Sequence, residues 1–452
     1  MSKYSFLLEP TKENAIDSLK KNSLNNNDWI SKCLKILLNM DDSIVSFNAK
    51  WGDGKTFLAK QMVSIINEIW KLQAGEIQDT DMSDIRNLDF DNLPKTSSFA
   101  IYYNAWEFDN ENNPVVSFLY FLLRELGKNI KTSKFKQVAT SFFNNLVSKI
   151  SYDLIDLSST PIEEQLEKVL DTVIDTEFIR AKIGEFINEL RSEKCNKLIV
   201  FIDELDRCRP IYALKVIEMI KHYLKMENVL VVCMTDIEQL AHCIQNVYGL
   251  NYDAYMYLDK IFDFKFNIPS NNYNIKEYIR RKSNLPFADN WFFDLTLLEV
   301  IKEFNLSLRN IDKLLSYSKF MILNKKEIES DFPVKAFVDY LFLPYYLAVR
   351  LFNDKLYNNF KNGQLEHYMN FCNRTSILKR IKKVYSPILG ESYDEAKIND
   401  YLEHDCRLLI QVLNGQEYLE ERFYVEKNAF RLDIKQLIKR LDLLNFFIEG
   451  TK

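Results

Sequence analysis

One stretch, residues 43–66, constrains the fold of this 452-residue chain more than any other part of the sequence. Its first residues, SIVSFN, form a short apolar run that predicts a buried strand. Its last residues, TFLAKQMVSII, carry apolar side chains at helical spacing and predict a helix. The turn between them, AKWGDGKT (49–56), has the residue types of a phosphate-binding loop. A strand, a tight turn and a helix in this order predict an α/β fold.

The loop predicts contacts with nucleotide phosphates. Gly52 and Gly54 let the backbone turn its N–H groups toward a phosphate, and the helix that follows adds the positive end of its dipole. Lys55 can reach the β- and γ-phosphates, and the Thr56 hydroxyl can ligate Mg²⁺. The usual pattern has glycine where this chain has Ala49, so the methyl group is expected to restrict the backbone and to alter the loop or its nucleotide affinity. The predicted nucleotide-binding residues of the loop are Ala49, Lys50, Trp51, Gly52, Asp53, Gly54, Lys55, Thr56 and Phe57.

A second motif lies in KLIVFIDELDR (197–207), an apolar run that ends in carboxylates. Such a run is typical of a strand buried on both faces of a parallel sheet. Phosphoryl transfer needs carboxylates at the end of a strand beside the loop, because they must support the metal and orient the attacking water. We expect Asp203 to support Mg²⁺ directly or through water, and Glu204 to polarise that water. Lys55 and Glu204 are therefore the first catalytic candidates. An acidic turn after a strand is common, and a GK[ST] triplet occurs by chance, so the two motifs together carry the prediction.

Five expected strands separated by helices predict a three-layer P-loop NTPase core with a mainly parallel sheet, followed by an α-helical C-terminal region. The expected strands lie within residues 44–47, 99–109, 197–207, 229–236 and 262–269. The predicted division is a helical lead-in (1–42), the core (43–270) with a helical insert at about 110–196, a helical sensor or lid region (271–330) and an α-helical C-terminal domain (331–452). Threonine, proline and glutamate at 160–163 predict a helix start. Helix breaks are expected near 284–286, 331–333, 362–363 and 386–387.

The composition bears on three classes of protein: nucleic-acid-binding, zinc-binding and membrane proteins. The net charge of −5 provides no overall basic excess for gripping nucleic acid or an anionic membrane. The basic stretch RTSILKRIKK (374–383) fits either a DNA contact or, more commonly, a solvated helix face. Seven cysteines without a CxxC pair suggest reduced thiols, four histidines show no metal-ligand pattern, and zinc is not expected. A helix needs about 18 apolar residues to span a bilayer, and no apolar run in the sequence approaches that length. We therefore expect a cytoplasmic protein without a transmembrane anchor.

The combined motifs resemble the KAP family of P-loop NTPases, in the additional-strand division with AAA+ and STAND ATPases. The resemblance covers roughly residues 30–320 and is carried by WGDGKTFL (51–58), YYNAWEFD (102–109), VFIDELDRCRP (200–210), VVCMTD (231–236) and YLDKIFDFKFNIP (257–269). The chain departs from the family pattern at Ala49 and at Glu204, where a second aspartate is frequent. Many members carry transmembrane segments between the two motifs, whereas the insert here is amphipathic and charged.

The resemblance implies roles for further residues. Asp206 and Arg207 match the family's LDR signature, and Asp236 is where a polar sensor of the γ-phosphate is expected, with Thr235 beside it. Arg309 sits where a sensor arginine from a following helical region could reach the nucleotide, and it is also plausible as a surface helix arginine. Asn104 and Trp106 match NAW without an assigned role. The candidates for an arginine finger reaching a neighbouring subunit are Arg207, Arg209, Arg280 and Arg281.

The resemblance also implies an ATPase switch that uses ATP and Mg²⁺ to rearrange the helical C-terminal half or to form a homo-oligomer. More loosely, it implies a bacterial anti-phage defence system in which the chain controls a partner effector protein. Two alternatives belong to other classes: a nucleotide-dependent scaffold with little hydrolysis, and a DNA-stimulated motor or loader.

Overall fold

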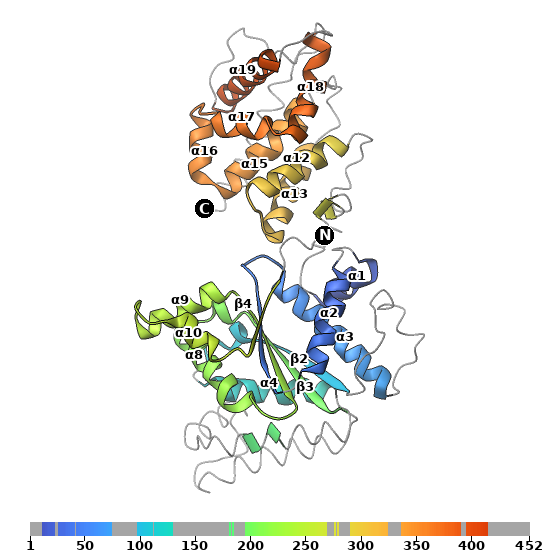
Figure 1. Ribbon diagram of the computed structural model, residues 1–452, viewed down its shortest axis with the longest axis vertical. Coiled ribbons are helices and arrows are strands. Elements are labelled where there is room, and N and C mark those ends of the chain that lie inside the picture. The colour runs from blue at the N-terminus through green and yellow to red at the C-terminus, as the bar shows by residue number, and fades with distance from the viewer. Residues whose placement is uncertain are drawn as a thin grey trace, which may run out of the picture. The chain divides into compact units, whose positions relative to one another are not determined.

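The computed structural model describes two compact units, residues Met1–Asn274 and Ile275–Lys452 (Figure 1). Within them, the described residues are 11–22, 26–40, 42–74, 97–111, 113–129, 180–181, 183–184, 195–268, 275–276, 278–279, 290–323, 336–389 and 395–414. Most of the predicted insert, the predicted helix start at 160–163 and the expected breaks near 284–286 and 331–333 lie outside these residues. The finer four-part division of the chain remains a prediction.

The first unit is built on a five-stranded sheet whose neighbouring strands are all parallel. The strands are β1 (Ile44–Asn48), β2 (Ser98–Asn104), β3 (Lys197–Asp203), β4 (Val229–Thr235) and β5 (Phe264–Asn267). Their order is β2-β3-β4-β1-β5, so β4 separates the loop strand β1 from the acidic strand β3. This arrangement confirms the expected α/β fold, and β4 is the additional strand that the resemblance implied.

Helices cover both faces of the sheet and make three layers (Figure 1). Alternate residues of the strands explain this: Val45 and Phe47 pack with one helical layer, and Ile44 packs with the other. The first layer contains α1 (Lys12–Lys21), α2 (Asn27–Asn39) and α3 (Lys55–Ala74). The second contains α4 (Pro114–Asn129), α8 (Pro210–Met219), α9 (Ile237–Tyr248) and α10 (Ala254–Asp259).

Three short turns complete the described part of this unit. They are the 3-10 turns η2 (Ala105–Phe108) and η3 (Leu205–Arg207) and the π-helical turn η4 (Ile220–Leu224) that extends α8. Both 3-10 turns directly follow the carboxyl ends of strands, η2 after β2 and η3 one residue after β3. They therefore lie at the sheet edge where parallel α/β folds bind ligands.

The second unit is helical in its described residues. Its elements are α12 (Asn290–Glu303), α13 (Leu308–Leu323), the π-helical turn η5 (Ala336–Phe342), α15 (Leu343–Phe352), α16 (Asp354–Lys361), α17 (Glu366–Cys372), α18 (Thr375–Leu389) and α19 (Glu395–Leu413). The apolar run 340–349 is a buried helical segment. No helix in the described parts of the chain is long and apolar enough to cross a membrane.

One expected helix break is confirmed and one is wrong. Helix α16 ends at Lys361, just before the expected break at 362–363, and Gly363 has a left-handed φ of 78°. The break expected at 386–387 does not occur, because α18 continues to Leu389. Pro387 lies in the last turn of that helix, where its missing N–H removes one backbone hydrogen bond without interrupting a long helix.

Helix α18 also contains most of the basic stretch 374–383. Ile377 and Ile381 point into the core of the second unit, whereas Lys379 and Lys383 are exposed. Arg374, just before the helix, pairs with Glu303 and stacks over the ring of Phe371. This alternation is what an amphipathic helix with a solvated basic face presents, and it gives the DNA interpretation no added support.

Candidate active site

The phosphate-binding loop joins the end of β1 to the start of α3. Gly52 and Gly54 have φ values of 92° and 82°, which side chains larger than glycine rarely adopt. Ala49 is not among the residues with positive φ, its N–H donates to the Thr235 carbonyl at 3.1 Å, and its methyl group packs in the core. The methyl group therefore imposes no left-handed strain, and its expected effect on the loop and on nucleotide affinity stays a prediction.

Lys55 and its neighbours occupy the first turn of α3. The Lys55 ammonium donates to the Ala49 carbonyl at 2.8 Å and lies 3.5 Å from Asp206 Oδ2, and the residue is only 8% exposed. Phe57 is buried, while Lys50 is exposed on the loop. Burial raises the pKa of Asp53, although the nearby lysines oppose the shift. The lysine thus lies over its own loop, at the position where the sequence predicts phosphate.

The two predicted carboxylates lie beside Thr56. Asp203, fully buried at the end of β3, accepts hydrogen bonds from the Tyr102 hydroxyl at 2.9 Å and from the Glu204 N–H at 2.8 Å. Glu204 Oε1 accepts the Thr56 hydroxyl at 3.2 Å, and Oε2 lies 2.5 Å from Arg207 Nε. The structure therefore brings the predicted metal-binding and water-activating residues to one place.

Burial is the main electrostatic influence on these acids. It raises the pKa of Asp203, whereas hydrogen bonds from Thr56 and Tyr102 lower it. Burial and the neighbouring Asp203 raise the pKa of Glu204, and Arg207 opposes them. The buried Asp203 and the half-buried Glu204 beside a hydroxyl supply hard oxygen ligands that fit Mg²⁺. No cluster of three or more His, Cys, Asp or Glu side chains suited to a metal occurs in the described chain. Mg²⁺ does not require such a cluster, because it retains waters and phosphate oxygens.

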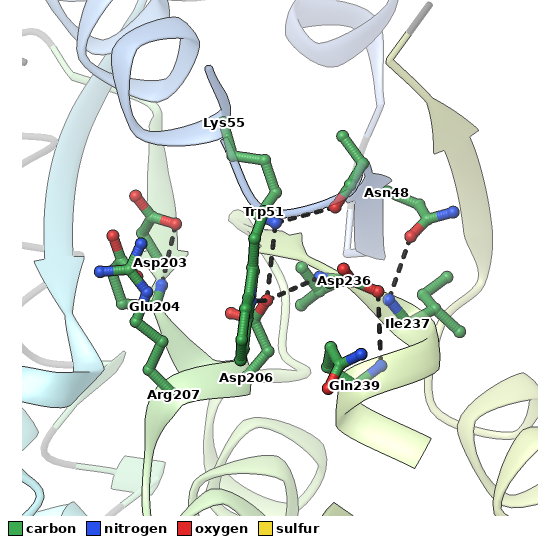
Figure 2. A network of polar contacts seen from close by, with 12 residues as sticks. Asn48, Trp51, Lys55, Asp203, Glu204, Asp206, Arg207, Asp236, Ile237 and Gln239 are labelled. Atoms are coloured by element: carbon green, nitrogen blue, oxygen red, sulfur yellow. Dashed lines mark hydrogen bonds and ion pairs between the residues drawn. The ribbon is translucent and has the colours of Figure 1, made fainter. Parts of the chain in front are cut away.

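Asp206 is the centre of a second polar network (Figure 2). Its Oδ2 accepts the Trp51 indole N–H at 2.7 Å and the Asp236 backbone N–H at 3.1 Å, and is the atom that faces Lys55. Its Oδ1 is buried without a hydrogen-bond partner. Asp236 also caps α9, because its Oδ1 accepts the Gln239 N–H at 3.3 Å. The LDR match singled out Asp206, but its link to Trp51 and Lys55 had no signal in the sequence.

The other predicted residues are distributed around this centre. The Thr235 hydroxyl contacts Ser46 at 3.0 Å inside the sheet, away from the loop. Asn104 caps η2 through the Trp106 N–H at 3.2 Å. Trp106 is 52% exposed, and the Arg207 guanidinium lies 5.7 Å from the centre of its ring. Tyr102, the first residue of the YYNAWEFD motif and one to which the sequence assigned no role, is a further residue of the site.

The arginines differ in what they contact. Arg207 is held by its own Glu204 and Trp106, while the Arg209 side chain is 63% exposed with its Nε 3.4 Å from Asp109. Arg309 is exposed on α13 of the second unit, which is described separately, so its sensor role stays a prediction. Arg280 and Arg281 lie outside the described residues.

A parallel sheet, a glycine loop that leads into the Lys55 helix, and paired acids on a nearby strand together define a P-loop NTPase domain. A model of the KAP family P-loop domain matches residues 26–323, more than half of the chain. The chain belongs to the KAP family, and the family supports nucleotide binding at this loop. A comparison with curated proteins finds no match.

Proposed function

We propose that this chain binds ATP with Mg²⁺ and hydrolyses it, and that the nucleotide state acts as a conformational or assembly switch. The observation that carries the proposal is the position of Thr56, whose hydroxyl lies 3.2 Å from Glu204 Oε1 while the adjacent Lys55 lies over the loop. The groups that we propose to bind phosphate, hold the metal and activate water therefore share one sheet edge. An acidic turn of purely structural origin needs no such convergence.

Each group has a distinct task in this proposal. The loop N–H groups and Lys55 bind the phosphates, and Thr56 and Asp203 hold Mg²⁺. The bound metal supplies positive charge that stabilises the transferring phosphoryl group. Glu204 orients a water for in-line attack and holds its proton, a task suited to a carboxylate whose pKa burial has raised.

A second candidate function, the scaffold that hardly hydrolyses ATP, is favoured by one observation. Both Glu204 oxygens are engaged, Oε1 by Thr56 and Oε2 by Arg207. A carboxylate held in this way has to exchange partners before it can accept a water. A metal that draws Thr56 away frees only one of the two oxygens, so slow turnover fits this site as well as fast turnover does.

The discriminating experiment measures ADP release by the full chain with and without Mg²⁺, together with ATP binding. E204Q keeps the shape of the side chain but removes the base, so we expect ATP binding to persist while kcat falls about 100-fold or more. K55A should lose ATP binding. K71A, at the far end of α3 where Lys71 pairs with Glu68 in the same helix, is the matched control and should behave as wild type.

Three outcomes separate the candidates. Hydrolysis that falls in E204Q supports the ATPase. ATP binding with negligible hydrolysis in both wild type and E204Q supports the scaffold. Absence of ATP binding by the wild-type chain contradicts both. Particle size measured with and without ATP in the same samples tests whether the nucleotide controls assembly into a homo-oligomer.

The biological setting that we propose for this switch is a cytoplasmic bacterial anti-phage defence system in which it controls an effector protein. The support is the family relationship together with the NTPase domain itself. Phage protection by a strain carrying the complete system should be lost in K55A and kept in K71A. Protection that persists in K55A would contradict the defence role while leaving the ATPase proposal intact.

A further inference from the structure

Asp206 lies outside the pair of acids proposed to act on metal and water, yet it contacts the loop more closely than either of them. Its side chain is 1% exposed, and one oxygen, Oδ2, faces three donors: the Trp51 indole, the Asp236 N–H and the Lys55 ammonium. The first two do not depend on Lys55. They fix the carboxylate in place whether or not the lysine is present.

Lys55 is therefore held by groups of the chain itself. Its ammonium is shared between the Ala49 carbonyl at 2.8 Å and the Asp206 carboxylate at 3.5 Å. To bind a phosphate, the ammonium has to exchange at least part of this contact for the new anion. Charges that are almost completely buried interact more strongly than charges in water, so the exchange carries a substantial cost.

We propose that Asp206 is a positioning residue that holds Lys55 in its nucleotide-free orientation and competes with nucleotide phosphates for the ammonium. This inference rests on the proposed nucleotide binding at the same loop. A competing internal anion lowers the apparent affinity, because only the fraction of molecules with a released lysine is competent to bind. The unpartnered Oδ1 leaves the carboxylate with no hydrogen bond on its other oxygen.

The competition makes a prediction that a purely structural role does not make. D206N keeps an oxygen that can accept from Trp51 and Asp236 but removes the negative charge. The nucleotide-free protein loses an ion pair, so its Tm should fall, whereas Mg²⁺-ADP should bind about tenfold more tightly, as expected when one interaction with a charged group is removed from the free state. If Asp206 only supported the loop, its substitution should lower both the Tm and the affinity for Mg²⁺-ADP.

Asp263 provides a matched control at the opposite end of β1. Its Oδ1 lies 2.7 Å from Lys225 Nζ, and its Oδ2 accepts the Ile44 N–H at 2.9 Å, so it also combines a lysine with a backbone donor. D263N should lower Tm without a change in ADP affinity. D206E keeps the charge and should not bind ADP more tightly than wild type.

The measurement is calorimetric titration of the full chain with Mg²⁺-ADP, alongside thermal unfolding without nucleotide. Tighter binding by D206N alone supports the competition. Equal or weaker binding by D206N, or equal tightening in D263N, overturns it. A wild-type chain that does not bind ADP contradicts the proposed function itself. If D206N does not fold, D206S serves instead: it also removes the negative charge that faces Lys55, so it should bind ADP more tightly than wild type, and equal or weaker binding overturns the competition.

Discussion

Glu204 has a backbone conformation that places its side chain beside Thr56 at a cost in stability. Its φ of 60° and ψ of 23° lie in the left-handed region, where a non-glycine residue costs on the order of 1–3 kcal/mol. The turn begins immediately after β3, so Asp203 ends the strand, Glu204 faces Thr56, and Leu205 returns to the core. A regular continuation of β3 would direct residues 203 and 204 to opposite faces of the sheet.

Arg207 should set the pH dependence of hydrolysis through Glu204. Burial, followed by Asp203, raises the pKa of Glu204, and Arg207 opposes both. R207M removes this opposition, so the pKa of Glu204 should rise further. Because Glu204 acts as a base only when deprotonated, the acid-side loss of kcat should begin at higher pH in R207M than in wild type. The measurement is a profile of kcat against pH.

R207K is the control for this prediction, because it retains a positive charge near Glu204. Its profile should lie between those of R207M and wild type. A uniform loss of kcat at every pH in R207M, with the acid limb unmoved, would show that Arg207 supports η3 structurally and does not act on the pKa of Glu204. Stacking on Trp106 is lost in R207M as well, so W106L separately measures the effect of that contact.

Some residue roles follow from side-chain chemistry and were predictable. Gly52 and Gly54 have left-handed φ values, and Thr56 lies beside the acids. The role of Asp206 was not predictable, because its partner Trp51 is 155 positions away in the chain and only the packed sheet edge brings them together. At Ala49 the usual pattern has a glycine, but the backbone of this chain does not adopt a positive φ there.

Helix α9 begins at the site, and Asp236 is its N-cap. Two substitutions of Asp236 can distinguish this structural role from the predicted role as a sensor of the γ-phosphate. The Asp236 side chain accepts the Gln239 N–H, so D236A should lower the free energy of unfolding by about 1 kcal/mol. Asparagine caps a helix as well as aspartate does, so D236N should leave the free energy of unfolding unchanged. If Asp236 also senses the γ-phosphate, both variants should lose the preference for ATP over ADP, as measured by titration with each nucleotide.

The comparison of D236A with D236N tests the side chain alone, because the backbone contact of residue 236 is the same in both variants. Its N–H donates to Asp206 in both variants, so the link from α9 to the loop is unaffected by the side chain. Equal destabilisation of D236A and D236N would contradict the capping role. An unchanged preference for ATP in both variants would assign Asp236 to capping alone.

At the level of elements, the sequence predicted strands better than their order. Strands β3 and β4 are buried along their whole length, so their apolar runs carry no alternation that identifies a neighbour. The position of β4 between β1 and β3 was not predicted, and the structure establishes it. Helix ends depended on local chemistry in the same way: Gly363 marked a real end, whereas Pro387 did not.

For the whole molecule, the functional question is how a nucleotide in the first unit influences the second. A ligand changes such an equilibrium only when it binds the two states with different affinity. An arginine from the second unit that contacts the γ-phosphate would provide this difference, since ATP and ADP differ at that group. Arg309 is the predicted residue, and its exposure on α13 leaves its side chain accessible.

R309A should therefore lower kcat by at least about tenfold while ATP binding stays within a few-fold of wild type, because the contact forms with the transferring phosphate. The second measurement is small-angle scattering of the E204Q chain with ATP and with ADP. A difference between the two nucleotides should disappear when R309A is added. K313A, one turn further along α13 and also exposed, is the matched control and should preserve both kcat and the difference. A normal kcat in R309A would show that Arg309 is a surface residue of α13 without a sensor role. Any coupling between the units would then depend on another group.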